Sequence, residues 1–176
     1  MFEEVVLAPD SRLKQECEPI EEITQEIKDL ANHMLDVMYA SNGCGLAGSQ
    51  IGIMKQICVI DTDWGPGSKK NPYVLINPEI KQLDGPEVCG NEGCLSYPGI
   101  SVEVSRPTHV VVHARNLDGK LLKYEASNNL LCVCLQHEID HLHGVTMVDH
   151  LSPAKKIVAM RDYKRAQEAG AKPGEC

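Results

Sequence analysis

Residues 128–142 read NNLLCVCLQHEIDHL, an apolar run that ends in two histidines. The run predicts a helix, which Gly144 should end. Positions four apart lie on one face of a helix, so His137 and His141 can bind the same metal ion. Glu138, beside the first histidine, is placed to take a proton from a metal-bound water. The stretch therefore indicates a hydrolytic metal site, without identifying the bond that is cut.

The segments around this helix predict an α+β fold. Apolar residues recur at helical spacing over 23–40, and a last helix is expected at about 153–169. Strand-like patterns occur at 56–61, 73–77, 100–104, 109–114 and 121–126. The last two strands should pair as a hairpin across Asp118-Gly119. We expect one domain, residues 1–176, with short, mostly antiparallel strands around the central motif helix and a helix near each terminus.

The composition excludes several classes of partner. The 176 residues carry a net charge of −8, and only 4% of them are aromatic. Negative charge and few aromatic side chains argue against general nucleic-acid binding. No apolar run approaches the ~18 residues of a membrane span, and the first residues lack a secretory signal pattern. We expect a cytoplasmic location, no direct membrane association, and mostly free thiols among the eight cysteines.

A catalytic zinc-type site usually has three protein ligands, so the two histidines need a partner. A metzincin pattern requires histidine where this chain has Met147, and a thermolysin-like pattern finds only Asp162 in place of glutamate. Upstream, Cys94 lies in a tight polar segment, EGCLS at 92–96. A thiolate there gives a Cys-His-His site with an open fourth position, suited to Fe(II), Co(II), Ni(II) or Zn(II).

A third segment is rich in glycine and reads GCGLAGSQ at 43–50. Its glycines exclude a helix interior and let the backbone approach a ligand, while Gln50 offers an uncharged amide donor. In this order, the segments at 43–50, 92–96 and 136–142 resemble the three signature motifs of peptide deformylases. One position departs from the family pattern, which usually has alanine where this chain has Gly48.

The resemblance implies a peptide deformylase of the bacterial type that ends in a C-terminal helix. Such an enzyme removes the formyl group from N-formylmethionyl nascent polypeptides and releases formate. The implied metal ligands are Cys94, His137 and His141, which hold one divalent ion per chain. Fe(II) is the implied native ion, with Zn(II), Ni(II) or Co(II) as alternatives.

The resemblance also implies the catalytic roles. Glu138 takes a proton from the attacking water and returns it to the leaving amine. The Gln50 side-chain amide and the Leu95 backbone N–H donate hydrogen bonds to the oxyanion, and one such donor typically lowers the barrier by about 3–4 kcal/mol. Metal-bound histidines usually donate their second N–H to a carboxylate, for which Glu92 and Asp140 are candidates. Arg106 is expected to neutralise Asp140.

The substrate contacts come from two arguments. Helix geometry places three side chains on the face of His137, where they should form an apolar wall for the methionine side chain: Leu130, Val133 and Cys134. The resemblance adds further pocket or peptide contacts: Cys44, Gly45 and Gly90. A peptide would pair with the extended backbone near Gly45 and Gly93.

Two other functions fit parts of the pattern. One is a metal hydrolase that acts on a different acyl group, and the other is a non-catalytic metal-binding or ribosome-associated module. The last helix also has two interpretations, because its basic residues can form a solvated face or a surface that docks on the ribosome near the peptide exit. These residues are Lys155, Lys156, Arg161, Lys164 and Arg165.

Overall fold

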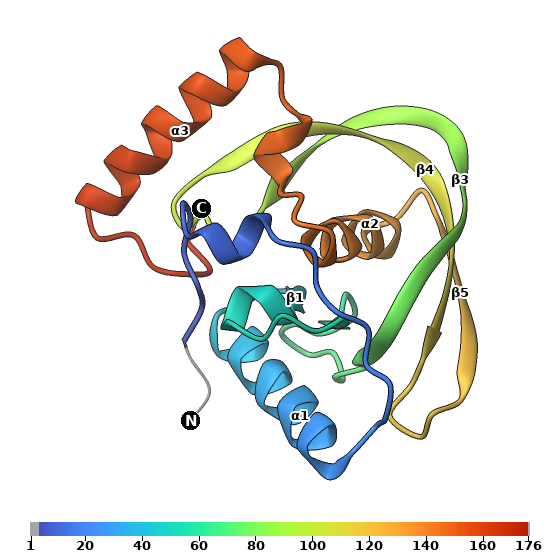
Figure 1. Ribbon diagram of the computed structural model, residues 1–176. Helices are drawn as coiled ribbons and strands as arrows, with labels where there is room; N and C mark the ends of the chain where they lie inside the picture. Colours follow the sequence, from blue (N-terminus) through green and yellow to red (C-terminus); the bar gives the residue numbers. More distant parts are fainter. Residues whose placement is uncertain (1–3, 176) are drawn as a thin grey trace.

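The computed structural model describes residues 4–175, and within them one five-stranded sheet curves around a central helix (Figure 1). Each strand is antiparallel to its neighbours in the order β1-β2-β3-β4-β5. The strands are β1 Gly45–Ala47, β2 Ile57–Ile60, β3 Tyr73–Gly93, β4 Ser101–Arg115 and β5 Leu121–Ser127. The helices are α1 Gln25–Ala40, α2 Leu130–Leu142 and α3 Pro153–Glu168, with 3-10 turns η1 Ser11–Lys14, η2 Gly48–Ile51 and η3 Met147–His150. The predicted α+β class is confirmed.

Two strands are longer than predicted. The segments expected at 100–104 and 109–114 form one strand, β4, of 15 residues, and β3 runs for 21 residues instead of ending at 77. Shifts in the β3–β4 register fall at Ile76/Glu79, Ile80/Gln82 and Asp84/Glu87. Pro78 and Pro86, which lack a backbone donor, lie within two of these shifts, so the pairing resumes beyond each proline. Strand β1 has no strand-like pattern in the sequence, although extended backbone was expected near Gly45, its first residue.

Helix α2 lies against the concave side of the sheet, and this contact forms the main part of the core. The Asn129 side chain accepts a hydrogen bond from the Cys132 N–H at 3.0 Å and caps the first turn. Leu135 and Ile139 are buried in the cluster that includes Val110 of β4. Burial of each such side chain contributes about 1.5–3 kcal/mol to folding.

The end of α2 is fixed by close packing. Gly144 has a φ of +71°, and a β-carbon at this position would lie 2.6 Å from the Lys14 carbonyl oxygen. Only glycine meets both conditions at low cost, so the predicted end of the motif helix is confirmed. The helix consequently stops one turn after His137, with His141 still inside it.

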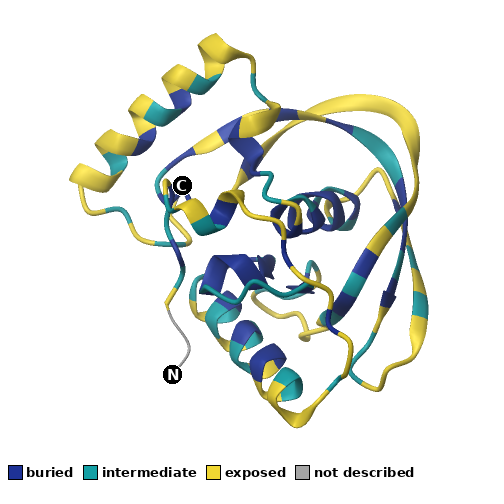
Figure 2. Ribbon diagram, viewed as in Figure 1, coloured by how far each residue is buried: buried dark blue, intermediate teal, exposed yellow. Residues whose placement is uncertain are grey.

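Helices α1 and α3 differ in how many of their side chains are buried. Met34 and Met38 of α1 are fully buried and share a cluster with Leu46 of β1. Figure 2 shows α3 as mostly exposed, and Ala159 and Tyr163 are its buried residues. The Tyr163 hydroxyl donates to the Ala8 carbonyl at 2.7 Å, which attaches this helix to the N-terminal segment.

A charged cluster links the N-terminal turn η1 to η3 and α3. Asp149 of η3 pairs with Lys14 of η1, and its other oxygen accepts from Lys156 of α3 at 2.9 Å. The Asp149 side chain also accepts from the Thr146 backbone N–H at 2.8 Å.

Among the helices of residues 4–175, none has the length and apolar character needed to cross a membrane.

Candidate metal centre and active site

Cys94, His137 and His141 lie together although they come from two parts of the chain. Cys94 follows β3, and both histidines project from α2. Their ligand atoms all lie within 4.8 Å of one another, and Cys94 Sγ is 3.3 Å from His141 Nε2. Ligands of one tetrahedral zinc-type ion, bound at about 2.0–2.3 Å, have separations of this order. One thiolate and two imidazoles also form a donor set that fits Zn(II), Fe(II), Co(II) or Ni(II).

The ring of His137 is held by a buried carboxylate. His137 Nδ1 lies 2.9 Å from Glu92 Oε1, which leaves Nε2 for the metal side. Arg106 in turn donates to Glu92 at 2.6 Å from Nε and at 2.9 Å from Nη2. Burial alone would raise the pKa of Glu92, but hydrogen bonds from His137 and Arg106 lower it to about 2. The carboxylate is therefore a fixed negative charge behind the ring.

Asp140 belongs to the same network. Its Oδ2 accepts from Arg106 Nη1 at 2.9 Å and lies 2.7 Å from His150 Nε2. Arg106 therefore lies between two carboxylates, with its shorter contact to Glu92 rather than to Asp140. His141 differs from His137, because its Nδ1 is buried and has no hydrogen-bond partner among residues 4–175.

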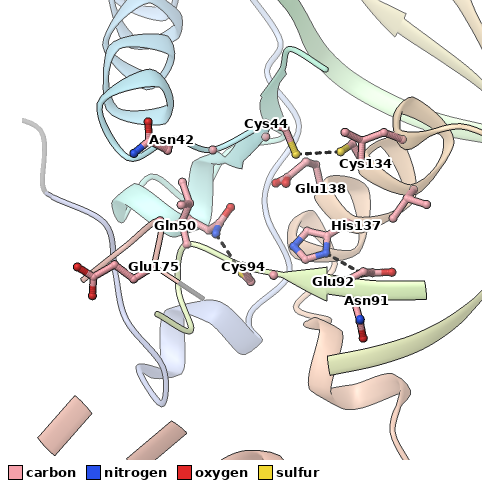
Figure 3. Close-up of a pocket in the computed structure, with 17 residues that line it drawn as sticks. Asn42, Cys44, Gln50, Asn91, Glu92, Cys94, Cys134, His137, Glu138 and Glu175 are labelled. Atoms are coloured by element: carbon pink, nitrogen blue, oxygen red, sulfur yellow. Dashed lines mark hydrogen bonds and ion pairs between the residues drawn. The ribbon is translucent and has the colours of Figure 1, made fainter. Parts of the chain in front are cut away.

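Glu138 points into the space beside His137 (Figure 3). It is 4% exposed, and burial raises its pKa to about 8. Its Oε2 is buried without a hydrogen-bond partner within the described part of the chain. An unpaired carboxyl oxygen is costly to bury, so this atom is positioned to interact with a water or a substrate group. A carboxyl with a pKa near neutrality can exchange a proton at physiological pH.

The amide of Gln50 has a fixed orientation. Gln50 Oε1 accepts from the Ala47 backbone N–H at 2.9 Å, so the amino group faces the opposite way. Nε2 lies 3.1 Å from Ser96 Oγ and 3.5 Å from Cys94 Sγ. The donor is therefore directed at the loop that carries Cys94 and Leu95.

The site opens into a cavity of about 220 Å³, called here the main cavity. Most of the residues expected to contact substrate line it: Cys44, Gly45, Gly93, Leu130, Val133 and Cys134. The residues with proposed metal-binding or catalytic roles that line it are Gln50, Glu92, Cys94, Leu95, His137 and Glu138. Gly90 does not line this cavity. It pairs with Val104 and lines an adjacent hollow of about 450 Å³, which Leu130 and Val133 also border.

Sequence reasoning missed several residues that line the main cavity: Asn42, Gly43, Asn91, Gly174 and Glu175. Asn42 and Gly43 lie between the end of α1 and Cys44, and Asn91 adjoins Glu92 on β3. The C-terminal pair reaches the cavity because the Glu175 carbonyl accepts from the Gly99 N–H at 2.7 Å. No sequence pattern marks this tail contact, since it depends on how α3 returns to the body.

The chain also matches a family model, described as polypeptide deformylase, over residues 2–157. The chain belongs to the peptide deformylase family. Among curated peptide deformylases, that of Hydrogenovibrio crunogenus is 41% identical over 162 residues, covering 92% of this chain and 93% of that protein. That of Bartonella henselae is 42% identical over 165 residues, covering 93% of each.

Solved peptide deformylases have the same fold. The crystal structure from Legionella pneumophila has a TM-score of 0.88 and 38% identity, covering 96% of this chain and 97% of that one. The structure from Ehrlichia chaffeensis in complex with actinonin has a TM-score of 0.84 and 33% identity, covering 96% and 98%. The family predicted from the three motifs is thereby confirmed, and with it the enzyme class, a hydrolase that removes N-formyl groups.

Proposed function

We propose that this peptide deformylase hydrolyses the formyl amide of N-formylmethionyl nascent polypeptides in the cytoplasm and releases formate. The observation that carries this proposal is the convergence of three potential metal ligands beside the buried carboxyl of Glu138, whose Oε2 has no hydrogen-bond partner among residues 4–175. A non-catalytic metal site would need neither that carboxyl nor the oriented amide of Gln50. Catalysis requires both a proton acceptor and donors for the developing negative charge.

We infer that Cys94, His137 and His141 hold one divalent ion, with Fe(II) as the native ion and Zn(II), Ni(II) or Co(II) as alternatives. When bound, the ion would supply Lewis acidity and lower the pKa of a coordinated water. Glu92 and Arg106 keep the ring of His137 in the orientation that such binding needs.

Glu138 moves the proton in this proposal. Its carboxylate accepts a proton from the water that attacks the formyl carbon, and it later delivers that proton to the amine nitrogen that leaves. Formate and a free methionyl amine result. Burial supports the second transfer, because a raised pKa keeps the protonated form available near neutral pH.

Gln50 and Leu95 act on the oxyanion. The Gln50 amino group faces the loop of Cys94 because the Ala47 N–H fixes the other end of the amide. The backbone N–H of Leu95, next to the thiolate, is the second proposed donor. Each such donor contributes about 3–4 kcal/mol when it is fixed before the reaction.

The apolar wall of the main cavity would take the methionine side chain. Leu130, Val133 and Cys134 of α2 form one part of it, and Cys44 faces them. The peptide backbone would pair with the segments at Gly45 and Gly93, on either side of the cavity. Gly90, which borders the adjacent hollow, would contact residues further along the peptide.

A second proposal concerns the ribosome. Most bases of α3 are exposed, including Lys164 and Arg165, whereas Lys156 is half-buried, and this helix projects from the body (Figure 1). A basic surface of this kind suits phosphate or acidic protein partners near a peptide exit. The double variant Lys164→Glu/Arg165→Glu, which keeps Tyr163 in place, should lose co-sedimentation with ribosomes. Unchanged sedimentation would contradict the docking role.

The activity test is formate release from a formyl-Met tripeptide by anaerobically prepared protein with its metal counted. The acetyl-Met tripeptide and the variant Glu138→Ala are run in parallel. We expect turnover on the formyl peptide, none on the acetyl peptide, and loss of turnover without loss of metal in the variant. Turnover of the acetyl peptide would favour a hydrolase of another acyl group. A fully metal-loaded protein with no turnover would reject the proposal.

A further inference from the structure

Two cysteines face each other in the wall of the main cavity. Cys44 lies just before β1 and Cys134 lies on α2, and their Sγ atoms are 3.2 Å apart (Figure 3). The two residues are separated by 90 positions in the sequence, so the fold alone brings the sulfurs together. Both residues line the cavity, which means that a small solute that enters it can reach them.

The distance leaves a short step to a covalent bond. A disulfide has an S–S length of about 2.05 Å, so the sulfurs need to approach by about 1 Å. The electrostatics also favour reaction at Cys44, because the Cys134 thiol donates a hydrogen bond that lowers the pKa of the Cys44 thiol. Cys58, in the core beneath, has its pKa raised by complete burial and does not line the cavity.

We propose that Cys44 and Cys134 form a redox modification site, in which a hydroperoxide converts the two thiols to a disulfide inside the cavity. The Cys44 thiolate attacks the peroxide, so an S–O bond forms as the O–O bond breaks and one water leaves. The Cys134 thiol then attacks the sulfenic sulfur, the S–S bond forms and a second water leaves. Two thiols are oxidised, and one hydrogen peroxide is reduced to two waters.

The disulfide would lower turnover through Gly45, the residue that follows Cys44. A β-carbon added at Gly45 would lie 2.5 Å from Glu138 Oε1, so there is no free space between β1 and the carboxyl. Drawing Cys44 toward α2 therefore moves the backbone against Glu138 and narrows the wall beside the proposed methionine slot. This effect on turnover rests on the proposed function, whereas the chemistry of the thiol pair does not.

The test is a peptide map of zinc-loaded protein after titration with hydrogen peroxide, digested at lysine and arginine without reduction. Zinc is chosen because it is not oxidised and it occupies the Cys94 thiolate. The peptide 29–55 contains Cys44 as its one cysteine, and 124–155 contains Cys132 and Cys134. We expect these two peptides linked, with the combined mass lower by two hydrogens, and separated again by dithiothreitol.

Variants identify the second sulfur. Cys132→Ala should retain the link, and Cys134→Ala should abolish it, because the two residues share one peptide. Formate release should fall by about tenfold or more on oxidation, since displacements of about 1 Å at a reacting group cost up to about 100-fold, and it should return on reduction. A map that shows both thiols free, or Cys44 linked elsewhere, would overturn the proposal even if the enzyme is an active deformylase. A confirmed link in a protein without deformylase activity would reject only the proposed function.

Discussion

The backbone at Gly45 and the carboxyl of Glu138 are in direct contact: a β-carbon at residue 45 would lie 2.5 Å from Oε1 and 2.8 Å from Cδ of that side chain. The contact involves the proposed proton carrier, so the absence of a side chain at residue 45 is a condition for its position. It also explains why a glycine begins the buried strand β1, although glycine usually costs stability in a strand.

Gly45→Ala should therefore reduce activity far more than metal binding. We expect kcat to fall by about 100-fold, because the added methyl displaces Glu138 by a fraction of an ångström or more. The metal content should stay at one ion per chain, since residue 45 does not touch the ligands. Steady-state kinetics on the formyl-Met peptide, with metal analysis of the same sample, measures both quantities. A variant that retains normal kcat would show that the carboxyl is free to move.

Gly48 is the position at which this chain departs from the usual family motif, and the structure leaves no room for a side chain there. A β-carbon there would lie 2.7 Å from the Ile53 carbonyl oxygen and 2.9 Å from the Lys55 carbonyl oxygen. Both neighbours are backbone atoms, so Gly48→Ala should destabilise the protein by about 1–3 kcal/mol. Urea unfolding measures this change. The control is Gly65→Ala, where a β-carbon would meet no atom of the other residues in 4–175 within 4 Å apart from its chain neighbours. Its stability should change by less than about 0.5 kcal/mol.

Arg106 neutralises two buried or half-buried carboxylates, Glu92 and Asp140. Arg106→Met should leave the Glu92 charge uncompensated and cost about 3–5 kcal/mol of stability. It should also weaken zinc binding by about 10–100-fold, because His137 loses its fixed orientation. Chelator competition and urea unfolding measure the two effects. In the control Arg161→Met, an exposed pair with the adjacent Asp162 is lost, and neither quantity should change appreciably.

The cluster around Asp149 predicts a pH dependence of stability. Partial burial would raise the pKa of Asp149, but hydrogen bonds from Lys14, the Thr146 N–H and Lys156 hold it well below its usual value. Its stabilising effect is therefore complete above the unfolded pKa of about 4 and is lost as the pH falls through the folded value.

Asp149→Asn should remove most of that effect. At pH 7 we expect a loss of about 1–2 kcal/mol, because the two lysines keep their charge but lose the carboxylate that accepts from them. The difference in unfolding free energy between wild type and variant should shrink as the pH falls from about 5 towards 2. Urea titrations at several pH values provide the test, and a difference that stays constant with pH would contradict it.

The sequence predicted the local parts of the site better than the distant ones. His137, Glu138 and His141 follow from helical periodicity, because one element positions all three. Cys94 was a candidate because it lies in a tight polar segment, but the resemblance of three motifs was needed to join it to the histidines, since no local rule connects a loop after a strand to a helix further along the chain. The register shifts that extend β3, and the tail that brings Glu175 to the cavity, depend on tertiary pairing that has no local pattern.

The hydrogen-bonded series from Asp140 through Arg106 and Glu92 to His137 has a consequence for how the enzyme matures. Its members come from α2, β4 and β3, so His137 is held in its binding orientation only when both long strands have closed around the helix. A chain with a frayed β4 offers the same three donors without that order, and its affinity for an ion is correspondingly low. We therefore expect tight metal binding at the proposed site only after the sheet has closed around α2, so that occupancy would report a complete sheet.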